Sequence, residues 1–167
     1  MTQSPPQAPT DSDLGARLND GASEADRLAE RAARQMWAED SASRGLGMRL
    51  LHVGPGTATI QMPIRPDMTN GHGICHGGFI FLLADSTFAF ACNSHNQRCV
   101  AAGAEVHFLA PGHSGQLLTA KGQEVHLAGR SGIYDIRVTN EDDDLVAVFR
   151  GRSATIRGHL VESDSSE

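Results

Sequence analysis

The chain has 167 residues, of which 40% are hydrophobic and 20% charged, so we expect one globular domain rather than a disordered or fibrous chain. A formal net charge of -6 and the lack of a basic stripe argue against a nucleic-acid partner. Three cysteines without a C-x-x-C pair favour a reduced, cytoplasmic protein.

The N-terminal part divides into two segments of different composition. Residues 1–21 are rich in Pro, Ser, Gln and Asp, without a basic start or an apolar core, so we expect a disordered extension and no secretory signal. Residues 22–44 are expected to form a helix and a linker, because Ser23 and Asp26 resemble a capping box ahead of strong helix formers. The apolar stripe of this helix comprises Leu28, Ala32, Met36 and Trp37.

Residues 45–160 form the predicted folded body, in which several segments have the alternation or composition of strands. The connections between the later segments are short, so we expect successive strands to pair antiparallel. Residues 161–167 are expected to be a disordered tail. The expected strands cover residues 47–56, 56–64, 104–109, 116–127, 132–140 and 145–156.

The apolar segment from Gly78 to about Cys92 is predicted to be a helix without a polar face. It is shorter than the roughly 20 apolar residues that span a bilayer, and it contains Asp85, so we expect no membrane span. A helix that is apolar nearly all round has to be covered on every side, and a curved sheet, helped by a second subunit, has enough surface for this. The sequence therefore predicts an α+β fold in which an antiparallel sheet wraps around a long central helix.

Four glycines fall between Asn70 and the first turn of this helix, which indicates tight backbone geometry or the close approach of a ligand. Gly77 and Gly78 lie where the helix should begin. The first N–H groups of a helix have no partner within it and lie at its positive end, so they suit a developing oxyanion. Because Gly77 has no Cβ, a carbonyl can reach its N–H without a clash.

Asp85 lies in the middle of the helix among apolar neighbours, where a carboxylate is costly unless it is hydrogen-bonded, paired or used in chemistry. It is either a structural aspartate bonded to Ser86, Thr87 or a neighbouring strand, or a base or nucleophile tuned by burial. Gly77 and Asp85 are separated by about 12 Å along one helix, whereas attack on a carbonyl needs about 3–3.5 Å. If both act on one substrate, Asp85 has to come from a second subunit.

Parts of the same stretch are compatible with other chemistries. His72, Cys75 and His76 form an H-x-x-C-H cluster, but no fourth ligand with suitable spacing lies nearby, so we predict no metal. Cys75 beside His76 resembles a nucleophile and its base, although nothing in the sequence orients the histidine. The glycine-rich run lacks the lysine of a phosphate-binding loop.

Between Asn70 and Ser94 the chain carries N-G-H-x-x-C-H-G-G, followed by L-A-D and F-A-x-A-C-N-S. The motifs F-L-x-P-G, G-x-Y-D-I and F-R-G-x-S follow in order at residues 108–112, 132–136 and 149–153. On these motifs the chain resembles the hotdog-fold acyl-CoA thioesterases of the phenylacetic-acid-degradation (PaaI) type, over roughly residues 37–160.

The resemblance implies hydrolysis of aryl-acetyl-CoA thioesters, such as phenylacetyl-CoA or hydroxyphenylacetyl-CoA, without a cofactor, since coenzyme A is part of the substrate. It implies that Asp85 is the catalytic carboxylate, as nucleophile or as base toward water, and that Gly77 donates its N–H to the thioester oxygen. Asn70 and His76 are then expected to position the thioester or the water. The resemblance also implies a homodimer with shared active sites, assembled as a dimer of dimers.

Coenzyme A carries phosphates, so we expect cations along an outer groove, and we expect the acyl pocket to be apolar. The candidates for binding the phosphates are Arg130, Arg150 and Arg152. The sequence is equally compatible with these three being ordinary surface arginines at strand ends. The candidates for the acyl group are Gly78, Phe79, Leu82 and Phe88, of which the large ones are equally compatible with core positions. Two other functions stay open: a hotdog hydratase or dehydratase that uses His76 with Asp85, and a non-catalytic acyl-CoA-binding module.

Overall fold

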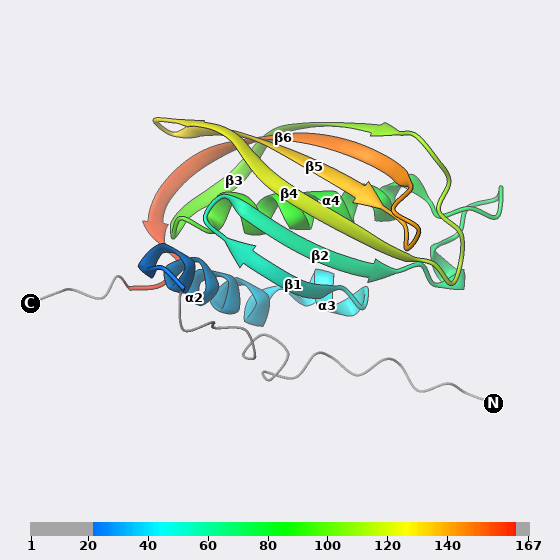
Figure 1. Cartoon of the computed structure of the whole chain (residues 1–167), viewed down its shortest axis with the longest axis horizontal. Helices are drawn as coiled ribbons and strands as arrows, with labels where there is room; N and C mark the ends of the chain where they lie inside the picture. Colours follow the sequence, from blue (N-terminus) through cyan, green and yellow to red (C-terminus); the bar gives the residue numbers. More distant parts are fainter. Residues whose placement is uncertain (1–21, 163–167) are drawn as a thin grey trace, which may run out of the picture.

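The computed structural model describes residues 22–162, so the predicted extension 1–21 and residues 163–167 of the predicted tail lie outside the described residues. A six-stranded antiparallel sheet curves around the long helix α4, as predicted, and α2 and α3 lie beside β1 at one edge of the sheet (Figure 1). The elements are α2 Glu24–Glu39, α3 Ser41–Gly45, β1 Arg49–Gly54, β2 Thr57–Pro63, the 3-10 turn η1 Pro66–Met68, α4 Gly77–Asn93, β3 Gln97–Phe108, β4 Leu117–Ala128, β5 Ser131–Thr139 and β6 Leu145–His159.

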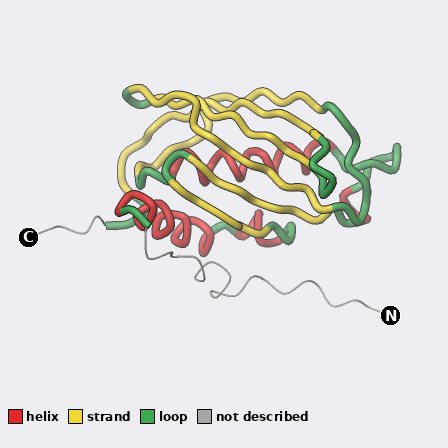
Figure 2. Tube along the Cα trace, viewed as in Figure 1, coloured by secondary structure: helices red, strands yellow, loops and turns green. Residues whose placement is uncertain are grey.

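The strand order in the sheet is β1-β2-β4-β5-β6-β3. The expected pairing of successive strands holds for β1 with β2 and for β4, β5 and β6, but it is wrong for β3 with β4: β3 pairs with β6, and β4 pairs with β2. Residues 109–116, between β3 and β4, form a long connection rather than a hairpin (Figure 2). Within it the Gly112 carbonyl accepts the Cys75 N–H at 2.8 Å, which ties the connection to the loop before α4.

α4 begins and ends within one residue of the predicted bounds, and the sheet closes tightly around it. An added Cβ at Gly122 on β4 would lie 3.2 Å from Thr87 Cγ2, and one at Gly151 on β6 would lie 2.8 Å from Phe88 Cδ2. These two glycines therefore let the strands approach the helix closely. Among residues 22–162, no helix is long and apolar enough to cross a membrane.

α2 covers part of α4 that the sheet leaves open. The predicted capping box is confirmed, since the Asp26 N–H donates to Ser23 Oγ at 3.1 Å and the Asp26 carboxylate accepts the Ser23 N–H at 3.0 Å. Trp37 of the predicted stripe is buried, and its ring lies against Phe90 of α4 with the centroids 5.8 Å apart. The apolar face of α2 thus extends the core beyond the sheet.

β3 is a long edge strand whose side chains are mostly exposed on both faces. Val100 is 46% exposed and Phe108, its last residue, is 52% exposed. The free side of such a strand presents backbone N–H and C=O groups that can pair with another chain. The fold therefore leaves one edge of its sheet open close to α4.

Candidate active site

Asn70 holds the loop before α4 in shape. Its side-chain Oδ1 accepts the N–H groups of His72 at 2.9 Å and of Ile74 at 3.4 Å, and its backbone N–H donates to the Ile74 carbonyl at 2.8 Å. The turn passes through Gly73 with a φ of 74°, which glycine adopts without steric cost. No described residue accepts a hydrogen bond from the side-chain Nδ2 of Asn70, so this amide group is available to donate to a ligand or to water.

His76 is the N-cap of α4. Its Nδ1 accepts the Gly78 N–H at 2.9 Å, and its backbone N–H donates to the Met68 carbonyl at 2.8 Å. A neutral imidazole has one acceptor nitrogen, so this bond leaves the ring proton on Nε2. His76 therefore fixes the start of the helix and keeps one N–H donor at the surface.

Gly77 is the first residue of α4, and its N–H has no acceptor among residues 22–162. This N–H lies at the positive end of the helix dipole. A cavity of about 560 Å³ opens at this point and brings together two of the predicted site residues, Asn70 and Gly77. The cavity is lined by Asn70, Ile74, Cys75, Gly77, Ile80 and residues 108–112.

Asp85 lies two turns further along α4 and does not line this cavity. Its side chain is half-buried, and the described part of the chain offers it no hydrogen bond or ion pair. The hydroxyls that would serve a structural aspartate bond elsewhere, Thr87 to the Leu83 carbonyl at 2.8 Å and Ser86 to the Ser43 hydroxyl at 2.9 Å. Burial raises the pKa of Asp85 above its ordinary value.

Comparison with known proteins identifies the family of this chain. Residues 72–147 match the thioesterase superfamily. The chain is 40% identical over 128 residues to the acyl-coenzyme A thioesterase PaaI of Escherichia coli K12, a match that covers 77% of this chain and 91% of that relative. The chain belongs to the PaaI-type hotdog thioesterases.

Solved structures agree with this assignment. The E. coli PaaI protein from the phenylacetic acid degradation operon has a TM-score of 0.79 and 39% identity, over 80% of this chain and 97% of that one. A mutant of the phenylacetic acid degradation protein PaaI from Thermus thermophilus has a TM-score of 0.68 and 35% identity, over 70% and 100% of the two chains. The hotdog fold expected from the sequence motifs is confirmed.

In this PaaI-type chain Cys75 does not form a nucleophile pair with His76. Cys75 is 3% exposed, and its Sγ lies 3.7 Å from the His76 carbonyl oxygen, to which the thiol donates. Burial raises the pKa of Cys75, which disfavours the reactive thiolate, and the His76 Nδ1 is occupied by Gly78. Among the residues that the structure describes, no three His, Cys, Asp or Glu side chains are grouped to hold a metal ion.

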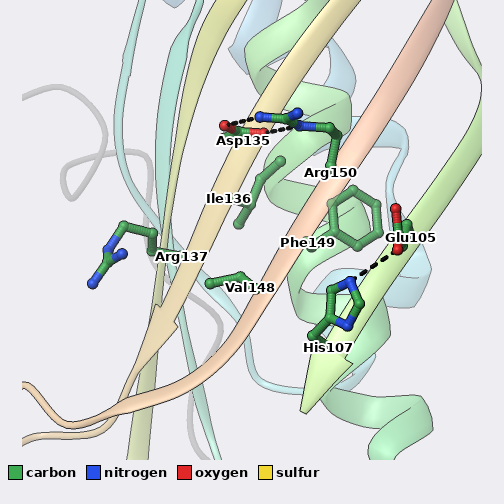
Figure 3. Close-up of a pocket in the computed structure, with 8 residues that line it drawn as sticks. All are labelled: Glu105, His107, Asp135, Ile136, Arg137, Val148, Phe149 and Arg150. Atoms are coloured by element: carbon green, nitrogen blue, oxygen red, sulfur yellow. Dashed lines mark hydrogen bonds and ion pairs between the residues drawn. The ribbon is translucent and has the colours of Figure 1, made fainter. Parts of the chain in front are cut away.

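Arg150, a candidate for binding the phosphates of coenzyme A, is held by an ion pair on the exposed face of the sheet. Its Nε and Nη2 donate to the two carboxylate oxygens of Asp135, both at 2.6 Å, and the guanidinium holds the pKa of Asp135 below its ordinary value (Figure 3). A hollow of about 340 Å³ surrounds this pair. It is lined by Glu105, His107, Asp135, Ile136, Arg137, Val148, Phe149 and Arg150.

The other two candidate arginines are also engaged with the protein. Arg130 donates through Nη2 to the Thr155 carbonyl at 2.8 Å, and Arg152 donates through Nη2 to the Ala102 carbonyl at 3.1 Å. Both side chains are exposed, and neither they nor Arg150 line the cavity at Gly77. Their role toward coenzyme A stays a prediction.

The residues predicted for the acyl group do not line the cavity either. Phe88 is 1% exposed, with its ring 5.5 Å from that of Tyr134 and 6.0 Å from that of Phe149, so it is a core residue, the alternative that the sequence had left open to a place in an acyl pocket. α4 turns Phe88 toward β5 and β6, which its apolar neighbours in the sequence did not reveal. Gly78 is exposed, while Phe79 and Leu82 are half-buried.

Sequence reasoning missed one wall of the cavity, residues 108–112. The motif F-L-x-P-G at these positions was the available signal. An added Cβ at Gly112 would lie 2.7 Å from Ile64 Cδ1, just after β2, and 3.5 Å from Cys75 Cβ, so the backbone there packs closely against the end of β2 and the loop before α4. This packing places Phe108, the first residue of the motif, beside Gly77.

Proposed function

We propose that this protein hydrolyses aryl-acetyl-CoA thioesters, of the phenylacetyl- or hydroxyphenylacetyl-CoA type, to the free acid and coenzyme A. One observation on α4 carries the proposal. The Gly77 N–H beside the cavity and the half-buried Asp85 carboxylate both lack a hydrogen-bond partner among the described residues. The E. coli relative is named an acyl-coenzyme A thioesterase, and its structure is that of a protein from the phenylacetic acid degradation operon. Both names support this substrate class.

The proposed site needs two copies of the chain. Gly77 and Asp85 lie on one continuous helix, about 12 Å apart along its axis, so they cannot reach the same carbonyl group. A second copy that faces the first supplies its own Asp85 to the cavity at Gly77. The exposed edge of β3 supports such a homodimer, because two edge strands related by a two-fold axis can pair, and we propose a dimer of these dimers.

Each group has a defined task in this site. The Gly77 N–H donates to the thioester oxygen as negative charge develops on it, at the positive end of α4. Asp85 of the second copy either attacks the carbonyl carbon or takes a proton from the attacking water; its raised pKa makes it a stronger base. In the direct route water adds to the carbonyl carbon, the C–S bond breaks, the thiolate leaves and is protonated, and the oxygen of water ends in the acid. In the nucleophilic route the attack of Asp85 breaks the C–S bond and leaves a mixed anhydride, which water then hydrolyses to the free acid and the regenerated carboxylate.

Asn70 and His76, the other two predicted catalytic residues, position groups in the site and take no part in bond making or breaking. The Asn70 Nδ2 group is free to donate to the thioester or to the water, and His76 holds the first turn of α4 in place. The proposed reaction uses no cofactor. We also propose that the protein works in the cytoplasm, where its three unpaired cysteines stay reduced.

The test is the release of free thiol from phenylacetyl-CoA by the purified protein. We expect Asp85→Ala to lower kcat at least about 100-fold, because the catalytic carboxylate is lost. Asp142→Ala, in an exposed turn, is the matched control and should keep full activity. Thermal unfolding of each variant reports on the fold, and near-normal turnover by folded Asp85→Ala would remove this mechanism.

A panel of CoA esters identifies the acyl group. A ranking led by phenylacetyl- or hydroxyphenylacetyl-CoA supports the proposal, whereas one led by long fatty acyl chains replaces the aryl assignment and keeps the reaction class. Conversion of an enoyl thioester without thiol release would instead indicate a hydratase. Saturable binding of acyl-CoA without turnover would indicate a binding module.

A further inference from the structure

Phe108 stands apart from the other aromatic residues of the protein. In the part of the chain that the structure describes, every other Phe, Tyr and Trp lies against a second ring. The pairs are Trp37 with Phe90, His76 with Phe79, Phe81 with Phe149, Phe88 with Tyr134, and Phe88 with Phe149. Within a single chain Phe108 has no such partner and is 52% exposed, although large apolar side chains are usually buried.

The unpaired ring lies at the cavity, directly on the first residue of α4. Phe108 is the one aromatic residue among those that line the cavity. An added Cβ at Gly77 would lie 3.0 Å from Phe108 Cζ and 3.3 Å from Cε1. A thioester whose oxygen binds the Gly77 N–H therefore has its carbonyl group close to this ring.

We propose that Phe108 selects the acyl group by contact between its ring and the aryl ring of an aryl-acetyl thioester; this inference rests on the proposed function. In such a substrate one methylene separates the aryl ring from the carbonyl carbon, so the two rings can meet edge to face or offset at about 4.5–7 Å between centroids. A saturated ring of similar size fills the same space without the aromatic contact. Phe108 is thus a specificity-determining residue rather than a catalytic one.

The experiment compares kcat/KM for phenylacetyl-CoA with kcat/KM for cyclohexylacetyl-CoA. We expect the wild type to favour the phenyl ester, and Phe108→Leu to lower the ratio of the two values about 2- to 13-fold, the range typical of an aromatic pair. Phe108→Tyr should keep the ratio, because it retains the ring. Leu51→Ala, which removes an exposed apolar side chain (37%) from the other edge strand, is the control and should leave the ratio unchanged.

The outcomes separate the two proposals. A wild type that releases no thiol from either ester overturns the proposed function. An active wild type without a preference for the phenyl ester overturns the inference on Phe108 alone. So does a folded Phe108→Leu variant whose two activities fall in equal proportion or stay unchanged. Phe108→Met provides the same test if the leucine variant does not fold.

Discussion

At the scale of single residues, the half-buried carboxylates of Glu124 and Asp85 differ in whether the protein supplies them with hydrogen bonds. Glu124 on β4 accepts hydrogen bonds from the Tyr134 hydroxyl at 2.8 Å and from the His95 Nε2 at 2.7 Å. Asp85 on α4 receives none from the described residues, and burial raises its pKa. Burying a polar group without partners destabilises a fold, so a carboxylate left in this state is a candidate for chemistry.

The raised pKa of Asp85 predicts how its replacement changes stability with pH. The folded chain holds the Asp85 proton more tightly than the unfolded chain, so the cost of ionising Asp85 develops as pH rises from the ordinary value of 3.8 through the raised pKa of the folded chain, and it stays constant above that pKa. Asp85→Asn removes this charge. We therefore expect its melting temperature at about pH 7 to exceed that of the wild type.

The same comparison at a pH well below 3.8, where Asp85 is protonated in the folded and the unfolded wild type alike, should show the difference disappear. Calorimetry or circular dichroism measures both conditions. A variant that is less stable than the wild type at neutral pH, or a gain that persists in acid, would refute the account of a burial cost at Asp85.

At the scale of elements, the start of α4 combines a cap with a free donor. His76 accepts the Gly78 N–H and has φ -62° and ψ 130°, an extended conformation that suits a residue before proline. Gly77 follows as the first helical residue, a position where proline is tolerated because its missing N–H has no partner in the helix. The donor can thus be removed without breaking the helix.

Gly77→Pro is therefore expected to abolish donation to the thioester while α4 persists. We expect kcat to fall about 10²–10³-fold, the usual effect of losing one oxyanion donor. Gly77→Ala keeps the N–H and adds a Cβ 3.0 Å from the Phe108 ring, so it controls for the added bulk and should lose less activity. Steady-state kinetics with thermal unfolding distinguish the effects; near-normal kcat in Gly77→Pro would exclude Gly77 as the donor.

At the scale of the whole molecule, one chain is an incomplete enzyme under the proposed function. Its cavity holds Gly77 and Asn70 but not Asp85, and its sheet ends in the exposed strand β3. In the proposed dimer a second copy would both cover an edge strand and complete the site. Under this proposal the chain has to form a dimer in order to be catalytically active.

Two inactive variants should complement each other in a mixed assembly. Co-expression of equal amounts of Asp85→Ala and Gly77→Pro chains should restore about a quarter of wild-type activity, because random pairing unites an intact Gly77 with an intact Asp85 in one site out of four. Each variant expressed alone should stay inactive. If assemblies shown by two affinity tags to contain both chains have no activity, the site is not shared between subunits.

Local features of the sequence determined the central helix, the capped start of α2, the glycines at the beginning of α4 and the unusual acid at Asp85. Each depends on the spacing of residues close together in the chain, and the sequence motifs added the family. Tertiary structure alone decided that β3 pairs with β6, that Phe88 belongs to the core and that Phe108 lies on Gly77. These contacts join residues far apart in the chain, and which of them form depends on how the sheet closes around α4, which no local pattern encodes.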